Sequence, residues 1–231
     1  MWQKKIEKIE AVLFDMDGLL LDTESMSQRA SRRAAACFGY ELDQAFSLGL
    51  IGRNGKDAKK RFQEIIAPDF PYSEYEKAFY QHYDREVKEK GIPVMKGVSE
   101  VFEILHEINI PSAIATSTHR AKALEKLKAT GLLAKVEQVV AGDQVEQGKP
   151  FPDIYLKAAE NLGVKPEKCL VLEDSHPGVR AGHASGAVVV MVPDLLPPTE
   201  EVSKLADGII SSLLDLIPSL KKLKQCRTNE M

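Results

Sequence analysis

The stretch AVLFDMDGLLLDTES, residues 11–25, combines an apolar run with acidic residues, and this pattern is the basis of the predicted fold. Four apolar residues run directly into Asp15, and Asp17 follows two positions later. Desolvating a carboxylate is costly, so acids at the end of a buried strand need a compensating partner. Residues i and i+2 of an extended chain share a face, so both carboxylates can address one point. The stretch predicts either a turn with two solvated acids or a metal-assisted site for phosphoryl chemistry.

Composition narrows the class of protein. With 44% hydrophobic and 28% charged residues among 231, the chain is expected to fold into a packed globular protein. A formal net charge of -3 predicts neither a nucleic-acid-binding face nor a polybasic membrane anchor. No apolar run reaches the roughly 18 residues of a membrane-spanning helix. Three scattered cysteines argue against a disulfide framework and a zinc site, and the expected compartment is the cytoplasm.

The second half of the chain alternates short β-branched runs with amphipathic stretches. Strands are predicted at 112–117, 136–142, 168–174, 187–192 and, more weakly, 207–211. Helices are predicted between them at 98–108, 120–131, 153–163 and 177–186. Continuously apolar strands separated by helices indicate a parallel sheet that is covered on both faces. The sequence therefore predicts a doubly wound, Rossmann-like α/β catalytic core formed by residues 1–20 and 92–231.

Residues 23 to 90 break that alternation. They contain three helical stretches, at 24–39, 56–66 and 73–90, and no convincing strand. A helical block inserted after the first strand predicts a small all-helical cap domain over residues 21–91. The alternative is that these helices simply pack on the sheet. The last residues, after about 223, are expected to fray.

Ligands of doubly wound sheets bind beyond the carboxyl ends of the strands, so the residues at those ends carry the functional prediction. Thr116 and Ser117 end the second predicted strand, and Lys149 follows the third. Glu173 and Asp174 end the fourth.

These residue types suit a phosphate group held beside a divalent cation. Asp15 and Asp174 could share a cation that offsets their mutual repulsion. Hard oxygen ligands without a His or Cys cluster favour Mg²⁺. Thr116 and nearby backbone N–H groups could hold phosphoryl oxygens, and Lys149 adds a positive charge. Taken singly, the same residues are explained by a turn, a helix cap or a surface lysine; their occurrence in order at successive strand ends favours the functional interpretation.

Four motifs carry a family resemblance: DMDGLLLDTE (15–24), ATST (115–118), GKPFPDIYLKAA (148–159) and LVLEDSHPGVRAG (170–182). They resemble the four motifs of the haloacid dehalogenase-like (HAD) hydrolase superfamily, and their order and spacing match as a set. The chain is similar to the branch with a helical cap after the first motif, which contains β-phosphoglucomutase and many small-metabolite phosphatases. The resemblance covers nearly the whole chain.

The resemblance implies a role for each residue. Asp15 would be the nucleophile that forms an aspartyl-phosphate, and Asp17 the general acid and then the base that activates water. Dehalogenases of the superfamily lack the second acid, so Asp17 favours phosphate chemistry. Thr116 and Lys149 would hold the phosphoryl group, with Ser117 a further candidate. The implied Mg²⁺ ligands are Asp15, the backbone carbonyl of Asp17, Asp174 and, directly or through water, Glu173.

The cap region departs from the pattern of the β-phosphoglucomutase branch. Ser27 stands where that branch usually has a His, and Gly49 stands where its substrate loop has a Lys. Arg53 of the same loop is retained and is a candidate contact for a polar or anionic substrate group. The two departures weaken the phosphomutase interpretation.

The leading hypothesis is a cytoplasmic, Mg²⁺-dependent phosphatase that hydrolyses a small phosphorylated metabolite, such as a sugar phosphate, through an aspartyl-phosphate. The alternatives are a β-phosphoglucomutase-like phosphomutase and a non-catalytic binding protein on the same fold. We expect a monomer or weak dimer, with no nucleic-acid or membrane partner.

Overall fold

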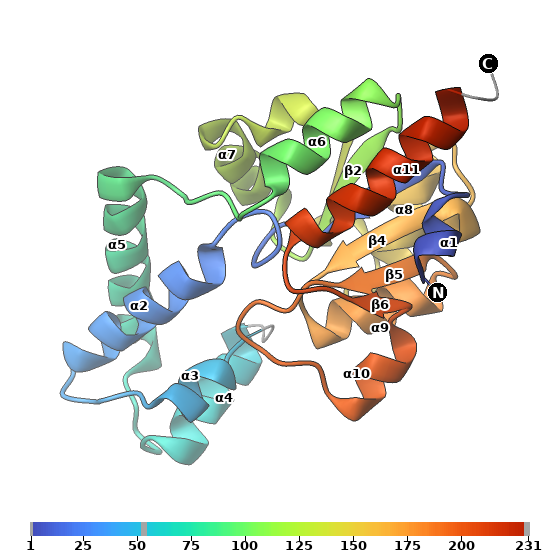
Figure 1. Ribbon diagram of the computed structural model, residues 1–231. Coiled ribbons are helices and arrows are strands. Elements are labelled where there is room, and N and C mark those ends of the chain that lie inside the picture. The colour runs from blue at the N-terminus through green and yellow to red at the C-terminus, as the bar shows by residue number, and fades with distance from the viewer. Residues whose placement is uncertain (1, 52–54, 229–231) are drawn as a thin grey trace. The chain divides into compact units, whose positions relative to one another are not determined.

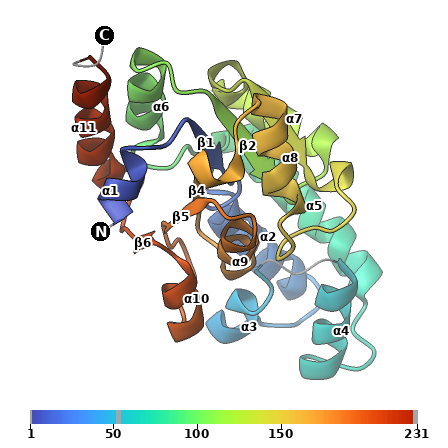
Figure 2. The ribbon, with the colours of Figure 1, turned by 90° about the vertical axis from the view of Figure 1, so that its right-hand side faces the viewer.

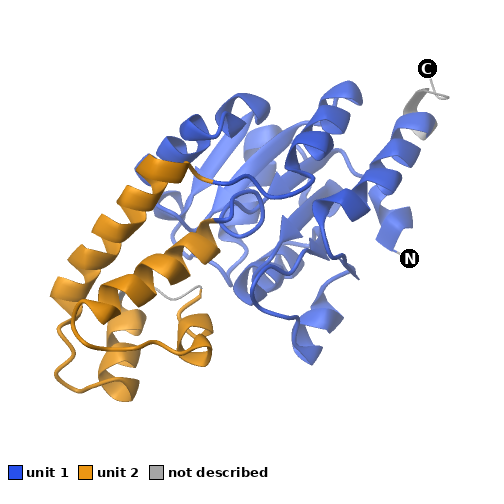
Figure 3. Ribbon diagram, turned by 60° about the vertical axis from the view of Figure 1, so that its left-hand side comes forward, with its two compact units in different colours: residues 1–22, 93–231 blue, residues 23–92 orange. Residues whose placement is uncertain are grey.

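The computed structural model describes residues 2–51 and 55–228. The chain divides into two compact units: a core unit of Met1–Asp22 and Pro93–Met231, and a helical unit of Thr23–Ile92 (Figure 3). None of the helices in the described ranges combines the length and the apolar character needed to cross a membrane.

A six-stranded sheet forms the centre of the core unit. Its strands are β1 (Ala11–Phe14), β2 (Ser112–Thr116), β3 (Gln138–Ala141), β4 (Cys169–Glu173), β5 (Val188–Met191) and β6 (Gly208–Ile209). The order across the sheet is β3-β2-β1-β4-β5-β6, and every neighbouring pair is parallel. β1 therefore lies between β2 and β4, with Leu13 opposite both Ala113 and Val171. The predicted doubly wound α/β fold is confirmed.

Helices cover both faces of this sheet (Figures 1 and 2). They are α1 (Trp2–Ile6), α6 (Val98–Glu107), α7 (Arg120–Ala129), α8 (Asp153–Leu162), α9 (His176–Ala184), α10 (Glu200–Leu205) and α11 (Ile217–Thr228). Short 3₁₀ turns occupy Leu132–Lys135, Gly142–Gln144, Pro166–Lys168 and Leu213–Leu216. In Figure 2 the sheet separates α1, α6 and α11 from α8 and α9.

The chain end corrects one expectation. Residues after about 223 were expected to fray, but α11 continues to Thr228. Leu220 and Leu223, three positions apart on this helix, are both buried. Their burial gives the terminal helix an apolar contact with the rest of the core unit, which explains why it forms.

Alternation along β1 explains why the strand is apolar throughout. Leu13 belongs to a cluster with Ile154 of α8 and Val179 of α9. On the opposite face, the ring of Phe14 lies 4.9 Å from that of Phe102 on α6. Because both faces are covered, all four residues of β1 are buried, as expected for a central parallel strand.

The helical unit consists of α2 (Thr23–Ala36), α3 (Gln44–Leu48), α4 (Gly55–Ile65) and α5 (Tyr72–Lys90). The described residues of this unit form helices and no strand, as predicted for the inserted segment. An aromatic core holds it together: the ring of Phe62 stacks on Phe70 at 4.4 Å and lies 4.5 Å from Tyr75. α2 and α5 are also joined by the ion pair of Arg29 with Glu86, whose Nε and Oε1 atoms are 2.8 Å apart.

Candidate active site

The carboxyl ends of β1 and β4 bring the first pair of predicted acids together. Asp15 directly follows β1, and its backbone N–H donates to Leu172 O of β4 at 3.0 Å. Gly18 then turns the chain with φ +90°, in the left-handed region that favours glycine. A Cβ at Gly18 would lie 2.3 Å from Asp174 Oδ2, so only glycine allows this loop to approach the end of β4 so closely.

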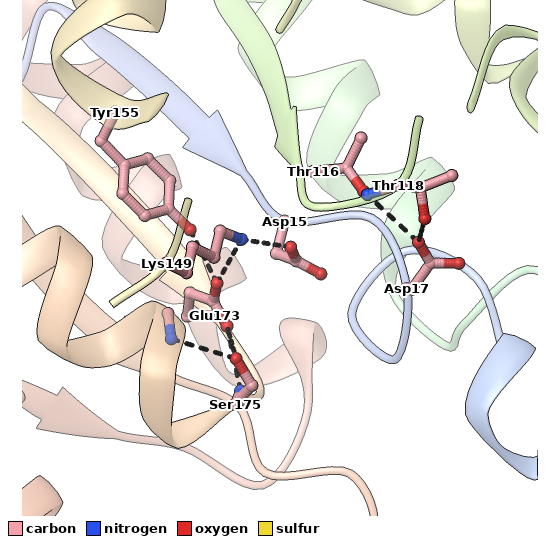
Figure 4. Close-up of polar contacts among 9 residues, drawn as sticks. Asp15, Asp17, Thr116, Thr118, Lys149, Tyr155, Glu173 and Ser175 are labelled. Atoms are coloured by element: carbon pink, nitrogen blue, oxygen red, sulfur yellow. Dashed lines mark hydrogen bonds and ion pairs between the residues drawn. The ribbon is translucent and has the colours of Figure 1, made fainter. Parts of the chain in front are cut away.

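Lys149 lies between Asp15 and Glu173 (Figure 4). Its Nζ donates to Asp15 Oδ1 and, at 2.6 Å, to Glu173 Oε1, and its side chain is buried. Tyr155 of α8 donates its hydroxyl to the same Glu173 oxygen at 2.8 Å. The other oxygen of Glu173 accepts from the backbone N–H and the hydroxyl of Ser175, both at 2.9 Å. Glu173 thus orients Lys149 toward Asp15.

The protonation states of the buried pair follow from this arrangement. Burial raises the pKa of Asp15 above its usual value; the charge of Lys149 opposes this rise, and the charge of Glu173 adds to it. Burial alone would lower the pKa of Lys149, but the facing carboxylates of Asp15 and Glu173 raise it well above its usual value. Lys149 is therefore a fixed ammonium group at the end of the sheet.

Three carboxylates form a cluster that fits a hard metal ion. Asp15, Glu173 and Asp174 are all buried, and one oxygen from each lies within 4.8 Å of the others. An all-oxygen donor set suits Mg²⁺ rather than a softer metal. Because both oxygens of Glu173 already accept hydrogen bonds, Asp15 and Asp174 are the side chains better suited to direct contact with an ion.

Asp17 has a separate set of partners on the β2 side of the site. Thr118 donates its hydroxyl to Asp17 Oδ2 at 2.6 Å, and Thr116 donates to the same oxygen at 3.3 Å. Lys126 of α7 donates to the other oxygen, Oδ1, at 2.6 Å. In Figure 4, Asp15 lies between Lys149 on one side and Asp17 on the other. The two acids of the first motif are thus held by two different lysines.

Most of the candidate residues lie together at one end of the sheet. They are Asp15, Asp17, Thr116, Lys149, Glu173 and Asp174. Thr116 is buried, and its hydroxyl contacts Asp17. Ser117 is exposed. Arg53 lies outside the described residues.

The sequence placed Thr118 at the end of the second predicted strand without a role, and Lys126 and Tyr155 were missed. Thr118 lies within the ATST motif, so its proximity to Asp17 could have been proposed. Tyr155 directly follows Ile154 on the apolar face of α8, so the sequence pattern predicts a core residue and gives no sign of a role in the site. Lys126 is one of several lysines at helical spacing in 120–129, and nothing in that pattern distinguishes it.

Comparison with known proteins gives the family. Residues 12–192 match the haloacid dehalogenase-like hydrolase family. The chain belongs to this family. The acids at the ends of β1 and β4 in this HAD-like hydrolase belong to the motifs on which the resemblance to the family was based.

Curated relatives narrow the branch. The hydrolase is 33% identical over 207 residues to the bifunctional riboflavin kinase/FMN phosphatase of Arabidopsis thaliana, a match that covers 89% of this chain and 54% of that protein. The chain therefore spans about half the length of that relative. It is 35% identical over 178 residues to the phosphorylated carbohydrates phosphatase of Thermotoga maritima, with 77% of this chain and 82% of that protein covered.

A solved structure agrees with these relatives. The crystal structure of CbbY from Rhodobacter sphaeroides in complex with phosphate superposes with a TM-score of 0.76 and 28% identity, over 92% of this chain and 99% of that chain. The hydrolase accordingly belongs to the phosphatase branch of the family and is a phosphoric monoester hydrolase.

Proposed function

We propose that the protein is a Mg²⁺-dependent phosphatase that hydrolyses a small phosphorylated metabolite, such as a sugar phosphate, through an aspartyl-phosphate. The observation that carries the proposal is the contact of Lys149 with both Asp15 and Glu173. A buried ammonium group beside a buried carboxylate at a strand end provides both a nucleophile and a positive charge for the phosphoryl oxygens.

In the first step, Asp15 Oδ attacks phosphorus and the ester P–O bond breaks. Asp17, protonated for this step, gives its proton to the leaving alcohol oxygen. Lys149 contacts the transferring group through its ammonium charge. Thr116, at the end of β2, is proposed to donate to a phosphoryl oxygen, with Ser117 and Arg53 as further substrate contacts.

In the second step, the Asp17 carboxylate takes a proton from water, and the oxygen of that water attacks phosphorus. Inorganic phosphate leaves and the carboxylate of Asp15 is regenerated, so the residues return to their starting states. Asp15, Asp174 and the backbone carbonyl of Asp17 would hold Mg²⁺, with Glu173 contributing directly or through water. When bound, the ion would screen the charges of the phosphoryl group and of the nucleophile.

The proposal is tested by phosphate release from p-nitrophenyl phosphate and from a sugar-phosphate panel, with and without Mg²⁺. Asp15→Asn should reduce kcat on the order of 10³-fold or more, because the amide oxygen is a poor nucleophile. Asp84→Asn, an exposed acid on α5, is the matched control and should retain activity.

Asp15→Asn with near wild-type activity would exclude Asp15 as the nucleophile. Conversion of a sugar 1-phosphate to its 6-phosphate isomer without phosphate release would replace the proposal with the phosphomutase alternative.

A further inference from the structure

Tyr155 is a fully buried tyrosine in the first turn of α8, and its exposed fraction is 0%. It belongs to the same apolar cluster as Leu13 of β1 and Val171 of β4. A phenylalanine would fill the same space without a polar atom, and burying a hydroxyl is unfavourable unless it forms a hydrogen bond. Packing alone therefore does not explain why a tyrosine occupies this position.

The hydroxyl of Tyr155 is used inside the site, where it lies 2.8 Å from Glu173 Oε1. A carboxylate only accepts hydrogen bonds, so the phenol is the donor. The same oxygen accepts from Lys149 Nζ at 2.6 Å. The other oxygen of Glu173 accepts from the backbone N–H and the hydroxyl of Ser175, both at 2.9 Å. Both ends of this carboxylate are thus held, and Tyr155 and Lys149 share one of its oxygens.

The ring of Tyr155 contacts Lys149 as well. The ammonium Nζ lies 5.1 Å from the ring centroid, within the range at which the face of an aromatic ring attracts a cation. In Figure 4 the ammonium group of Lys149 lies between Tyr155 and Asp15. Tyr155 therefore acts on Lys149 in two ways, directly through its ring and indirectly through its hydrogen bond to Glu173.

The position of Tyr155 is set by the sheet and not by a bound molecule. Its backbone N–H donates to Pro152 O at 3.0 Å, and its ring is anchored in the apolar cluster of the core unit. Lys149 precedes α8 and carries a flexible four-carbon stem. Contacts with a fixed neighbour restrict that stem before a substrate arrives, which lowers the entropy lost on binding.

Sharing one carboxylate oxygen also has an electrostatic consequence. In a buried site the attraction between Glu173 and Lys149 is strong, and it competes with the attraction of Lys149 for a phosphoryl oxygen. A second donor on Glu173 Oε1 offsets part of the negative charge that Lys149 meets. Without this donor, we expect Glu173 to draw the ammonium group away from Asp15.

We propose that Tyr155 is a positioning residue that directs the Lys149 ammonium group toward the phosphoryl group in the transition state. The inference rests on the proposed phosphatase function. Because Tyr155 is fully buried, it acts through Lys149 and Glu173 and not by touching the substrate. Loss of its hydroxyl should therefore weaken binding of the transition state more than binding of the substrate or product.

Tyr155→Phe removes the hydroxyl and keeps the ring. In assays of phosphate release from p-nitrophenyl phosphate with Mg²⁺, kcat/KM should fall about tenfold, the effect expected for losing one hydrogen bond to a charged group. Ser185→Ala is the matched control, because it also removes a buried hydroxyl of the core unit, whose Oγ donates to Gly182 O at 2.7 Å. This control should retain wild-type kcat/KM.

Two oxyanions distinguish a positioning role from general damage to the site. Orthovanadate can adopt the five-coordinate geometry of a phosphoryl group in transfer, whereas inorganic phosphate is the tetrahedral product. In Tyr155→Phe the Ki of orthovanadate should rise about tenfold, and the Ki of phosphate should change little. An equal rise for both anions would show that Tyr155 has a structural role alone and would overturn the inference.

Binding of Mg²⁺ tests whether the effect passes through Lys149 or through the acid cluster. Thermal unfolding at increasing MgCl₂, without substrate, gives the apparent affinity for the ion. Glu173 keeps its contacts with Lys149 and Ser175 in Tyr155→Phe, so this affinity should match that of the wild type. A loss of Mg²⁺ affinity as large as the loss of orthovanadate affinity would assign Tyr155 to the metal site and overturn the inference.

The inference and the proposed function fail in different ways. Wild-type kcat/KM in Tyr155→Phe, beside an active wild type, would overturn the inference and leave the phosphatase function standing. A wild-type protein that releases no phosphate from p-nitrophenyl phosphate or from the sugar-phosphate panel would overturn both.

Discussion

At the residue scale, Asp17 depends on neighbours that its own motif does not contain. Lys126 and Thr118 hold its two carboxylate oxygens, each at 2.6 Å. The acid–base role that we propose for Asp17 needs a fixed orientation of its carboxylate as well as the right chemistry. Lys126 acts through Asp17, and we regard it as a positioning residue.

Lys126→Met should therefore slow the step that Asp17 assists. We expect kcat/KM to fall about 10- to 100-fold for an alkyl phosphate, and much less for p-nitrophenyl phosphate, whose leaving group needs little protonation. Lys122→Met, an exposed lysine of the same helix, is the control. Equal losses with both substrates would contradict the assignment.

A second residue-scale feature is Asp194, in the segment after β5. Its Oδ2 is buried without a hydrogen-bond partner, and burial, with the nearby charge of Asp22, raises its pKa to about 6. The folded state therefore keeps a proton that the unfolded state loses near pH 4. The contribution of Asp194 to the free energy of unfolding is fully present below about pH 4 and is lost as the pH rises through about 6.

Asp194→Asn removes the charge and should stabilise the protein at pH 7.5 by about 1 kcal/mol, after allowance for solvent screening, and very little at pH 4. Urea unfolding at both pH values measures the difference. Glu103→Gln, at an exposed position of α6, should give no such pH dependence. A gain that is the same at both pH values would refute the explanation.

At the element scale, α9 starts close to the end of β4 because Gly178 has no side chain. A Cβ there would lie 1.6 Å from Glu173 Oε1, and Glu173 is fixed by Lys149, Tyr155 and Ser175. Gly178→Ala should destabilise the protein by about 1–3 kcal/mol and lower activity, because Glu173 must shift and move Lys149.

Thermal unfolding and phosphate release measure the two effects of Gly178→Ala. Gly148→Ala is the control for stability, since a Cβ at Gly148 meets nothing within 4 Å. A Gly178→Ala variant as stable and active as the wild type would show that α9 can move away without disturbing Glu173.

The elements also show what the sequence could and could not predict. Strands with continuous apolar runs, such as β4 and β5, stand out because burial on both faces demands apolar residues. The short helix α3 was missed, although Asp43 caps it by accepting from Phe46 N at 2.6 Å. In the site, residues at strand ends were predictable from topology. Lys126 and Tyr155 were not predictable, because they lie on helices and reach the site through tertiary packing, which the local sequence does not show.

At the scale of the whole molecule, binding of Mg²⁺ by the acid cluster of the core unit should raise the thermal stability of the folded protein, an effect that can be measured separately from activity. Mg²⁺ that binds only the folded state at about 100 times its Kd adds about 2.7 kcal/mol to stability, which corresponds to several degrees in Tm. Asp174→Asn should lose this rise while retaining a folded state without metal.

The comparison is made by thermal unfolding with MgCl₂ and with EDTA. Asp143→Asn, an exposed acid whose pKa is lowered chiefly by its hydrogen bond to the Arg120 backbone, controls for non-specific ion effects. A magnesium-dependent rise that persists in Asp174→Asn would place the ion elsewhere.

The place of β1 at the middle of the sheet has a consequence during protein synthesis. Asp15 leaves the ribosome well before Lys149, which follows 134 residues later, a delay of roughly 7 to 27 s at about 5–20 residues per second. Until β2 and then β4 emerge, the apolar strand Ala11–Phe14 has two open edges, which invite pairing with other chains. The newborn chain therefore exposes an aggregation-prone strand before the neighbouring strands exist, and Asp15 gains its partner Lys149 late.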